Sequence, residues 1–389
     1  MEGARLLTRP FVLAVLAELA LCMSIGMLIV IIPVYANDEL GVGSLGVAIA
    51  VGAVSPAILL SQPLAGRIGD RKGRRVLIVG GALVAAASIA GYALASSLAL
   101  LIVFRLFTGL GEAALLVGAA TMITDIAPEA RRGEALSIYS LGLWGGLALG
   151  PLLGELVLGD DRFLAVWLLA ACFCLVAAAV GSFLPETAPE RPEVDPWTRS
   201  RLLHPAAVGP GLVLAVTLLG FAGLGTFAAL YARELGMDGA GAVFLVFSIV
   251  VVATRIVARK APDRLGPKRA SGTALLLISA GLLTIGIWNT PAGLYAGTVV
   301  VAFGHALAFP ALMTLAVNGA PATERSSVVG TFTAFTELGF AVGALSLGAI
   351  ASRLGYDGLF IACAVGPLVG ALLLMRLTSP RPAPVLDPA

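Results

Sequence analysis

Charged residues are scarce in this sequence, at 12% of 389 residues, against roughly 25% in a soluble domain. That leaves too little polar surface to solvate a globule, so lipid must surround most of the chain. The two histidines and the scattered acidic residues make no cluster with metal-ligand spacing. No phosphate-binding P-loop is present, which excludes an ATP-driven pump in this chain. Neither paired carboxylates nor a Ser-His-Asp order indicates a hydrolase, so we expect no enzyme activity, cofactor or metal.

Cysteine is also rare, and its spacing suits neither a disulfide framework nor a zinc site. We expect the cysteines to be small lipid-facing or core-facing residues: Cys22, Cys172, Cys174 and Cys363. A cleavable signal peptide is not indicated, because the first apolar run, about 11–36, is too long and lacks an A-x-A cleavage site. We expect this run to remain as the first helix.

Apolar residues, in contrast, make up 59% of the chain, and the mean hydropathy is +0.99. Twelve apolar runs are long enough to cross a hydrocarbon core of roughly 30 Å. They fall near residues 10–36, 43–66, 75–95, 98–123, 134–158, 162–184, 208–232, 239–259, 270–289, 292–318, 326–351 and 355–377. The predicted fold class is an all-α membrane protein with 12 transmembrane helices, which places both termini on one side.

The basic residues orient these helices. With the N-terminus inside, 21 of the 25 basic residues fall in cytoplasmic segments, Arg255 among them. Only Arg162, Arg233 and Arg353 fall outside, and Arg105 lies within a span. The positive-inside rule therefore predicts that both termini are cytoplasmic, in a multi-pass protein of the inner (plasma) membrane.

One long polar stretch interrupts the apolar runs. Pro185 to Pro205 holds five prolines and seven charged residues without an apolar period, which is typical of a linker. We therefore expect an N-terminal six-helix bundle (1–184), a cytoplasmic linker (185–207) and a C-terminal six-helix bundle (208–378). The Pro-rich residues 379–389 are expected to be a disordered tail.

The two bundles repeat each other at an offset of 193 residues. The charged hairpin Gly66–Arg75 returns as Asp263–Arg269, and Ala127-Pro128 returns as Ala320-Pro321. The same offset relates further pairs: Arg132 and Arg325, Gly146 and Gly339, Gly150 and Gly343, and Glu112 and His305. Parallel six-helix repeats are the pattern of a large transporter class, whose binding site lies at the midplane between the halves.

The hairpin itself combines three glycines, Gly66, Gly69 and Gly73, which permit a tight turn, with a basic cluster that contains one acid, Asp70. The residue types alone leave open a simple anchor at the inner membrane face. The segment resembles the signature G-x-L-x-D-R-x-G-R-R of the major facilitator superfamily, with Ile68 in place of leucine. Length, span number, linker and repeat extend this resemblance to the whole chain, which resembles the 12-helix drug:proton antiporters.

The resemblance implies a cytoplasmic gate, in which the acid and arginines of the hairpin latch the two halves together. Its residues would be Gly66, Asp70, Arg71, Gly73, Arg74, Asp125, Asp263 and Arg264. Asp70 would contact the start of the run 326–351, near Arg325 and Ser326, and Arg74 would reach Asp125. The second hairpin departs from the pattern because Pro267 follows its glycine.

The run 98–123 carries Arg105, Gly109 and Glu112 on one helical face. A charge at this depth costs several kcal/mol unless it faces protein or a water-filled cavity. A structural ion pair to a neighbouring helix is one interpretation. The stretch also resembles the R-x-x-x-G motif of proton-coupled family members, which implies that Arg105 tunes or relays protons at Glu112.

Glycines at four-residue spacing mark the run 134–158: Gly146, Gly150 and Gly154, with Pro151 between them. Small residues at this spacing permit close helix packing, and proline adds a kink. The run also resembles the G-x-x-x-G-P-x-x-G motif of the family's antiporters, which implies export. Glu155 stands where the family often has glycine.

Three further ionisable residues lie within predicted spans: Glu18, His305 and Glu337. A buried carboxylate balanced between loss of water and a neighbouring cation can exchange protons in the working pH range. We therefore group them with Glu112 and Arg105 as proton-coupling candidates. The alternatives are a Glu18 that snorkels to the interface and a His305 that is a hydrogen-bonded packing residue. Apolar candidates for a substrate cavity are Met23, Met27, Trp144, Phe221, Phe227, Phe303, Phe332 and Phe335, although such residues more often face lipid or core.

These patterns and the resemblance predict a proton-coupled antiporter that exports amphipathic or lipophilic small molecules, of the multidrug efflux type. One half would rock against the other. The expected partners are the small-molecule substrate, protons and the bilayer, with no nucleic acid, and the protein is expected to be a monomer. An alternative is a sugar, metabolite or lipid carrier, including an uptake symporter, and a remote one is a non-transporting receptor.

Overall fold

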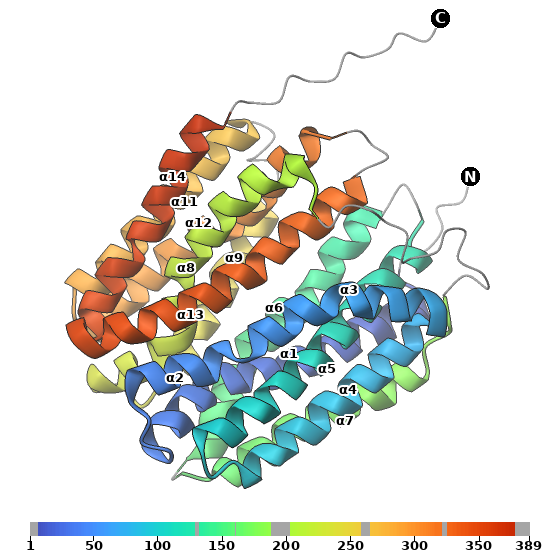
Figure 1. The fold of residues 1–389 in the computed structure, drawn as a ribbon, viewed down its shortest axis with the longest axis horizontal. Helices are drawn as coiled ribbons and strands as arrows, with labels where there is room; N and C mark the ends of the chain where they lie inside the picture. Colours follow the sequence, from blue (N-terminus) through green and yellow to red (C-terminus); the bar gives the residue numbers. More distant parts are fainter. Residues whose placement is uncertain are drawn as a thin grey trace, which may run out of the picture.

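The computed structural model describes residues 7–128, 132–159, 161–187, 203–257, 265–320 and 325–377, and within these ranges the regular structure is helical (Figure 1). The helices are α1 (Arg9–Asp38), α2 (Gly43–Gly52), α3 (Val54–Lys72), α4 (Arg74–Gly91), α5 (Leu98–Ile126), α6 (Arg132–Leu158), α7 (Phe163–Ser182), α8 (Pro205–Glu234), α9 (Gly241–Val257), α11 (Pro267–Ile287), α12 (Pro291–Asn318), α13 (Arg325–Cys363) and α14 (Val365–Arg376). The predicted all-α membrane fold is confirmed.

Each predicted apolar run corresponds to helical structure. In the described ranges, 10 helical stretches are long and apolar enough to cross a membrane, and α9 is a shorter apolar helix. The last stretch, Val328–Arg376, holds two predicted spans. They are divided at Gly355, whose φ of +72° interrupts the helix. Glycine adopts this left-handed backbone without a steric penalty, so the boundary predicted between 351 and 355 is present.

One predicted span is broken in two. The run 43–66 forms α2 and α3, which are separated at Ala53. Pro56 follows three residues later and has no N–H to donate to the carbonyl of Gly52, so the helical hydrogen-bond ladder is interrupted at this point. The missing N–H leaves the carbonyl of Gly52 without its helical donor.

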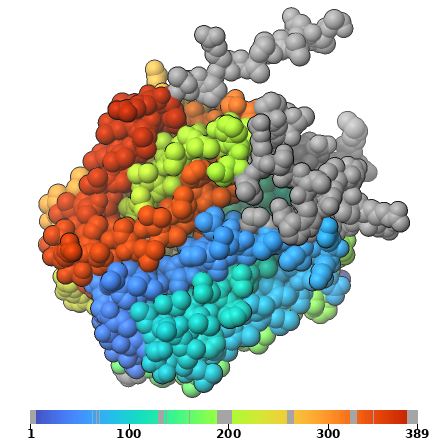
Figure 2. All heavy atoms as spheres, viewed as in Figure 1, coloured from blue at the N-terminus to red at the C-terminus, as the bar shows by residue number. Residues whose placement is uncertain are grey.

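The helices form two groups, α1–α7 and α8–α14, which lie side by side (Figure 1). The groups meet where α2 and α3 pack against α13, α6 against α9, and α1 against α8. The space-filling view shows α2 and α3 running along α13 across one face (Figure 2). Any space between the two groups is therefore bordered by α1, α2, α3 and α6 on one side and by α8, α9 and α13 on the other.

The same close helix contacts occur in both halves. A Cβ atom on Gly111 of α5 would lie 2.6 Å from the carbonyl oxygen of Gly81 in α4. A Cβ atom on Gly304 of α12 would lie 2.6 Å from the carbonyl oxygen of Ala274 in α11. Each residue of the second pair lies 193 positions after its counterpart. The repeat read from the sequence is therefore a repeat of backbone packing.

Candidate functional site

A cavity of about 630 Å³ lies between the two halves. Its wall comes from α1, α2, α3, α5 and α6 on one side, and from α8, α9, α11, α12 and α13 on the other. Apolar and aromatic side chains make up most of this wall. The volume lies within the range of roughly 300–1,000 Å³ typical of small-molecule sites.

Four of the five proton-coupling candidates line this cavity: Arg105 and Glu112 from α5, His305 from α12 and Glu337 from α13. Glu112 and Arg105 are buried. Each half of the molecule thus contributes one carboxylate to the same enclosed space. The geometry brings these residues together, and their part in proton coupling stays a prediction.

Arg105 is held by backbone rather than by an acid. Its Nε donates to the carbonyl of Ala50 at 3.2 Å, and its Nη2 donates to the carbonyl of Val51 at 3.0 Å. Both acceptors lie in the last turns of α2, next to the break at Ala53. Arg105 therefore links α5 to the broken helix, which differs from the ion pair considered as its structural interpretation.

Glu18 lies outside the cavity wall. Its side chain is 1% exposed and is enclosed between α1 and α6, where its Oε2 would lie 3.3 Å from a Cβ atom on Gly142. In the described ranges this oxygen has no hydrogen-bond partner. The interpretation of Glu18 as a residue that snorkels to the membrane interface is therefore wrong, because α6 covers it.

The apolar candidates divide in the same way. Trp144 and Phe221 line the cavity. The other candidates lie outside its wall: Met23, Met27, Phe227, Phe303, Phe332 and Phe335. Phe227 and Phe332 are fully buried in helix–helix cores, whereas Phe303 is 43% exposed on the outer surface. Hydropathy places a residue in a span but does not tell which face of the helix it occupies, so these assignments are corrected.

An aromatic cluster surrounds His305. The ring of Phe221 stacks on His305 with a centroid distance of 4.5 Å, and Phe247 of α9 lies 5.6 Å from it. Trp144 of α6 approaches edge-on at 5.9 Å. Aromatic rings at these separations attract each other in stacked and edge-on arrangements. His305 is thus packed among rings, and Trp144 inserts from the opposite half.

Arg255 of α9 is the lining residue that sequence reasoning placed elsewhere. The positive-inside rule predicts a cytoplasmic position for it, but it lines the cavity, with its guanidinium carbon 5.2 Å from the ring centroid of Trp144. Phe244 and Phe247 were likewise not selected. The sequence signal that could have found Arg255 is its place inside the apolar run 239–259, 193 positions after Gln62 in the run 43–66.

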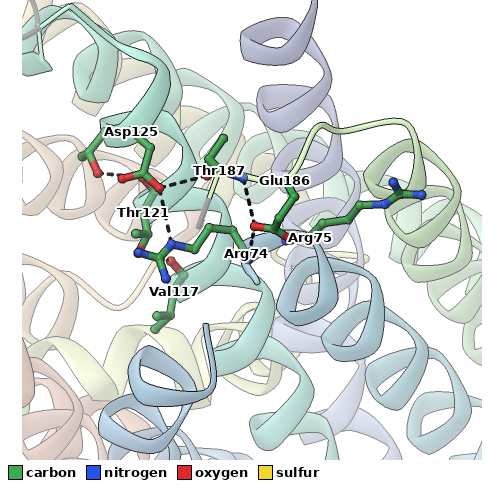
Figure 3. A network of polar contacts seen from close by, with 8 residues as sticks. Arg74, Arg75, Val117, Thr121, Asp125, Glu186 and Thr187 are labelled. Atoms are coloured by element: carbon green, nitrogen blue, oxygen red, sulfur yellow. Dashed lines mark hydrogen bonds and ion pairs between the residues drawn. The ribbon is translucent and has the colours of Figure 1, made fainter. Parts of the chain in front are cut away.

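The hairpin between α3 and α4 lies at the end of the molecule where α1 begins and α14 ends. The predicted contact of Arg74 with Asp125 is present, with Nε 3.3 Å from Oδ2. The carboxylate of Glu186 accepts from the backbone N–H groups of Arg74 at 2.7 Å and Arg75 at 3.2 Å, and Thr187 donates to Asp125 at 2.9 Å (Figure 3). The sequence predicts Glu186 and Thr187 to be part of the linker, whereas their side chains contact the hairpin and the end of α5.

The rest of the predicted gate is only partly described. Gly73 separates α3 from α4 with a φ of +108°, a conformation that favours glycine. Gly66 lies in α3, and Arg71 is exposed near its end. Asp263 and Arg264 lie outside the described residues, as do the side chains of Asp70, Arg325 and Ser326. The latch between the halves therefore stays a prediction.

Polar contacts join the halves at the opposite end. The carboxylate of Glu155 in α6 accepts from the backbone N–H groups of Ala240 at 2.6 Å and Gly241 at 2.7 Å, at the start of α9. Asp38 at the end of α1 pairs with Arg233 of α8 at 2.7 Å. The far ends of the two bundles are thus held together.

The glycine stripe of α6 packs against α1. Cβ atoms on Gly146 and Gly150 would lie 2.5 Å from Cys22 and from the carbonyl oxygen of Met23, respectively. A Cβ atom on Gly154 would lie 3.2 Å from the Cα of Met27, and Pro151 contacts the position of Gly26. The stripe therefore serves close packing, and its link to antiport stays a prediction.

Comparisons with known proteins agree with this architecture. The model of the Major Facilitator Superfamily matches residues 14–269 and 211–389. An uncharacterised MFS-type transporter of Salmonella typhimurium is 29% identical over 368 residues, which cover 91% of this chain and 93% of the relative. Two solved structures share the fold, with coverage of 94% of this chain and 95% of theirs. One is a POT family transporter in complex with a peptide conjugate (TM-score 0.80, 14% identity). The other is a bacterial homologue of the lysosomal transporter Spinster (TM-score 0.79, 15% identity). The family match spans both halves, so this chain belongs to the Major Facilitator Superfamily and is a membrane transporter rather than an enzyme.

Proposed function

We propose that this protein is a secondary active transporter that exports amphipathic or lipophilic small molecules in exchange for protons. The observation that carries the proposal is the composition of the cavity between the halves. Its wall is mainly apolar and aromatic, and the two carboxylates that line it among the described residues, Glu112 and Glu337, come one from each half. An apolar wall favours an apolar substrate body, and carboxylates are groups that can carry protons.

The coupling follows from the cost of charge in an apolar space. A carboxylate that loses its water without gaining a partner is costly, so Glu112 and Glu337 need a proton or a polar group beside them. Protonation of these carboxylates and binding of a substrate in the same cavity then compete with each other. Such competition for one site is how a proton gradient drives export by an alternating-access transporter.

Arg105 takes a positioning role in this proposal. Its two hydrogen bonds to the carbonyls of Ala50 and Val51 fix the broken helix against α5. Glu112 lies on the same helical face, two turns further along α5. Arg105 thereby keeps a fixed positive charge near the carboxylate and stabilises the wall opposite it.

Transport requires the two halves to separate at the end of the molecule opposite the hairpin, which we call the closed end. The contacts that would break are those of Glu155 with the start of α9 and the ion pair of Asp38 with Arg233. Rocking one half against the other would separate them and expose the cavity at that end. The positive-inside bias supports an orientation in which this end faces outward and both termini face the cytoplasm of an inner-membrane protein.

The test is efflux from proteoliposomes with an imposed proton gradient, with a panel of cationic, neutral and anionic dyes and antibiotics. We expect gradient-driven flux for the intact protein. Glu112→Gln and Glu337→Gln should each abolish accumulation against a gradient while substrate exchange without a gradient persists. Glu39→Gln is the matched control, because Glu39 is exposed beyond the end of α1. If both cavity variants retain gradient-driven transport, the coupling assignment is wrong.

The same assay separates the alternatives. A sugar or metabolite symporter would accumulate a polar substrate in the direction of proton flow, and dyes would neither move nor compete. Polar lining groups such as Gln62, Thr217 and Thr336 are the ones that would serve such a substrate. A receptor would bind ligand without any flux.

A further inference from the structure

The cavity wall contains hydrogen-bond donors that the described protein leaves without acceptors. The Nε of Arg255 and the Nε1 of Trp144 are both buried and have no hydrogen-bond partner in the described ranges. They belong to side chains in contact, because the Arg255 guanidinium carbon lies 5.2 Å from the Trp144 ring centroid. Both residues line the same cavity, one from each half.

Both of these groups donate hydrogen bonds and accept none. A guanidinium has only donors and stays charged, and an indole nitrogen also only donates. A buried donor without an acceptor is costly, so this part of the wall is suited to a ligand that brings acceptor oxygens. The positive charge of Arg255 makes an anionic acceptor more favourable than a neutral carbonyl.

The cavity's other charged groups do not satisfy Arg255. Among the described residues, no ion pair joins it to Glu112 or Glu337. Arg105, the second arginine of the wall, differs in this respect because two backbone carbonyls accept from it. Of the two cavity arginines, Arg255 is the one placed to receive an anion.

The neighbouring groups fit the rest of such a ligand. Phe221, Phe247 and His305 form the aromatic cluster that Trp144 enters, and all of them line the cavity. An apolar or aromatic body would pack against these rings while its anionic group met Arg255. Thr336 supplies a further buried hydroxyl without a partner among the described residues, on the lining stretch of α13.

We infer that the cavity binds an amphipathic organic anion, whose carboxylate, sulfonate or phosphate group is held by Arg255 and the indole N–H of Trp144. This inference shares one assumption with the proposed function, namely that the cavity is the site where the substrate binds. It narrows the substrate class from amphipathic compounds in general to those with one anionic group beside an apolar body. Arg255 and Trp144 come from opposite halves, so such an anion would bridge them.

The experiment uses three ligands with the same ring system and different head groups: 1-naphthoate, 1-naphthamide and 1-naphthylmethylammonium. Binding to the purified full-length protein in lipid nanodiscs is measured by equilibrium dialysis near neutral pH. We expect 1-naphthoate to bind roughly tenfold to a hundredfold more tightly than the other two, as for a charge-assisted hydrogen bond. Arg255→Gln should remove this preference, and Trp144→Phe should reduce it by a smaller factor.

Two further variants distinguish recognition from a structural role. Arg255→Lys keeps the charge without the planar fork and should retain part of the preference. Arg353→Gln removes an exposed arginine of α13 and should leave all three affinities unchanged. Thermal unfolding of each variant shows whether it is folded.

Equal affinity for the three ligands, no binding of any, or a preference for the ammonium compound would overturn the inference. Retention of the 1-naphthoate preference in a folded Arg255→Gln protein would do the same. The result is separable from the proposed function, because dialysis needs no proton gradient. Anion binding that depends on Arg255 can persist where proton-driven efflux fails, and efflux of other dyes can persist where anion binding fails.

Discussion

At Gly111 in the first half and Gly304 in the second, an added Cβ atom would meet the backbone of a neighbouring helix at 2.6 Å in both cases. One position further along, the two halves differ completely: Glu112 and His305 both line the cavity, one as an acid and the other within a cluster of rings. Equivalent backbones thus carry different chemistry. The repeat has been kept where helices touch each other and has diverged where they face the cavity.

Other equivalent positions follow the same rule. Gln62 and Arg255 lie 193 residues apart and both line the cavity, as do Trp144 and Glu337. Helix packing tolerates little change in volume, and both halves must satisfy it with the same geometry. A side chain that faces a cavity has no such restriction. We therefore expect substrate and proton chemistry at the cavity-lining positions where the two halves carry different residues.

The largest effect should come from breaking the shared packing. Gly111→Val and Gly304→Val each place side-chain atoms against the backbone of α4 or α11, and each should lower the free energy of unfolding by about 3 kcal/mol. The two losses should be similar because the contacts are equivalent. Thermal unfolding in detergent measures them. Gly80→Val is the control, because nothing lies within 4 Å of a Cβ atom there. A loss in one half only would show that the packing is not equivalent.

The next effect contrasts Arg105 with its counterpart, Thr298. Arg105→Met leaves the carbonyls of Ala50 and Val51 without their donor, and we expect a loss of about 2 kcal/mol. Thr298 is buried, and its hydroxyl has no partner among the described residues. Thr298→Val keeps the shape and removes an unsatisfied group, so stability should stay the same or rise slightly. The same thermal assay reads both variants. A costly Thr298→Val would mean that this hydroxyl has a partner in the membrane.

The sequence predicted the fold because the bilayer fixes helix length. Twelve runs, the boundary near Gly355 and the repeat at 193 residues all follow from apolar length and local glycine chemistry. The break at Ala53 could not be read from apolar length, because the run is continuous and only Pro56 signals it. Proline lies within other helices without dividing them, for example Pro151 of α6.

The site was predicted less completely, because hydropathy reports depth in the membrane and not the direction of a side chain. Phe221 and Phe227 lie in one span, yet only Phe221 lines the cavity. Intramembrane charge was the stronger signal, since Arg105, Glu112 and Glu337 all reach the cavity. The positive-inside rule places Arg255 on the cytoplasmic side, because a charge near the end of a run satisfies that rule. The folded structure was needed to show that α9 directs it inward.

A smaller effect tests how the halves are joined at their far end. Glu155 accepts from the backbone of Gly241, and the positions 193 residues away, Gly348 and Ala48, form the equivalent contact without any charge. Glu155→Ala should weaken the closed end by about 1–2 kcal/mol and raise the fraction of molecules open there. Labelling of an engineered cysteine in the cavity from the outer side measures that fraction. The variant protein should remain folded, and an unchanged labelling rate would contradict a closing role for Glu155.

The smallest effect is expected at the ion pair of Asp38 with Arg233, which has no equivalent in the repeat. Its side chains are 35–36% exposed, and pairs this exposed to water contribute only about 0.2–1 kcal/mol. Asp38→Asn should therefore change the labelling rate less than Glu155→Ala does. Raising the salt concentration should reproduce the effect in the unmodified protein, because exposed pairs are screened, and should add nothing in Asp38→Asn. Asp38→Asn could instead open the far end more than Glu155→Ala does. The closed state would then depend on an ion pair that has no counterpart in the repeat. In that case the repeat would not explain how the halves meet.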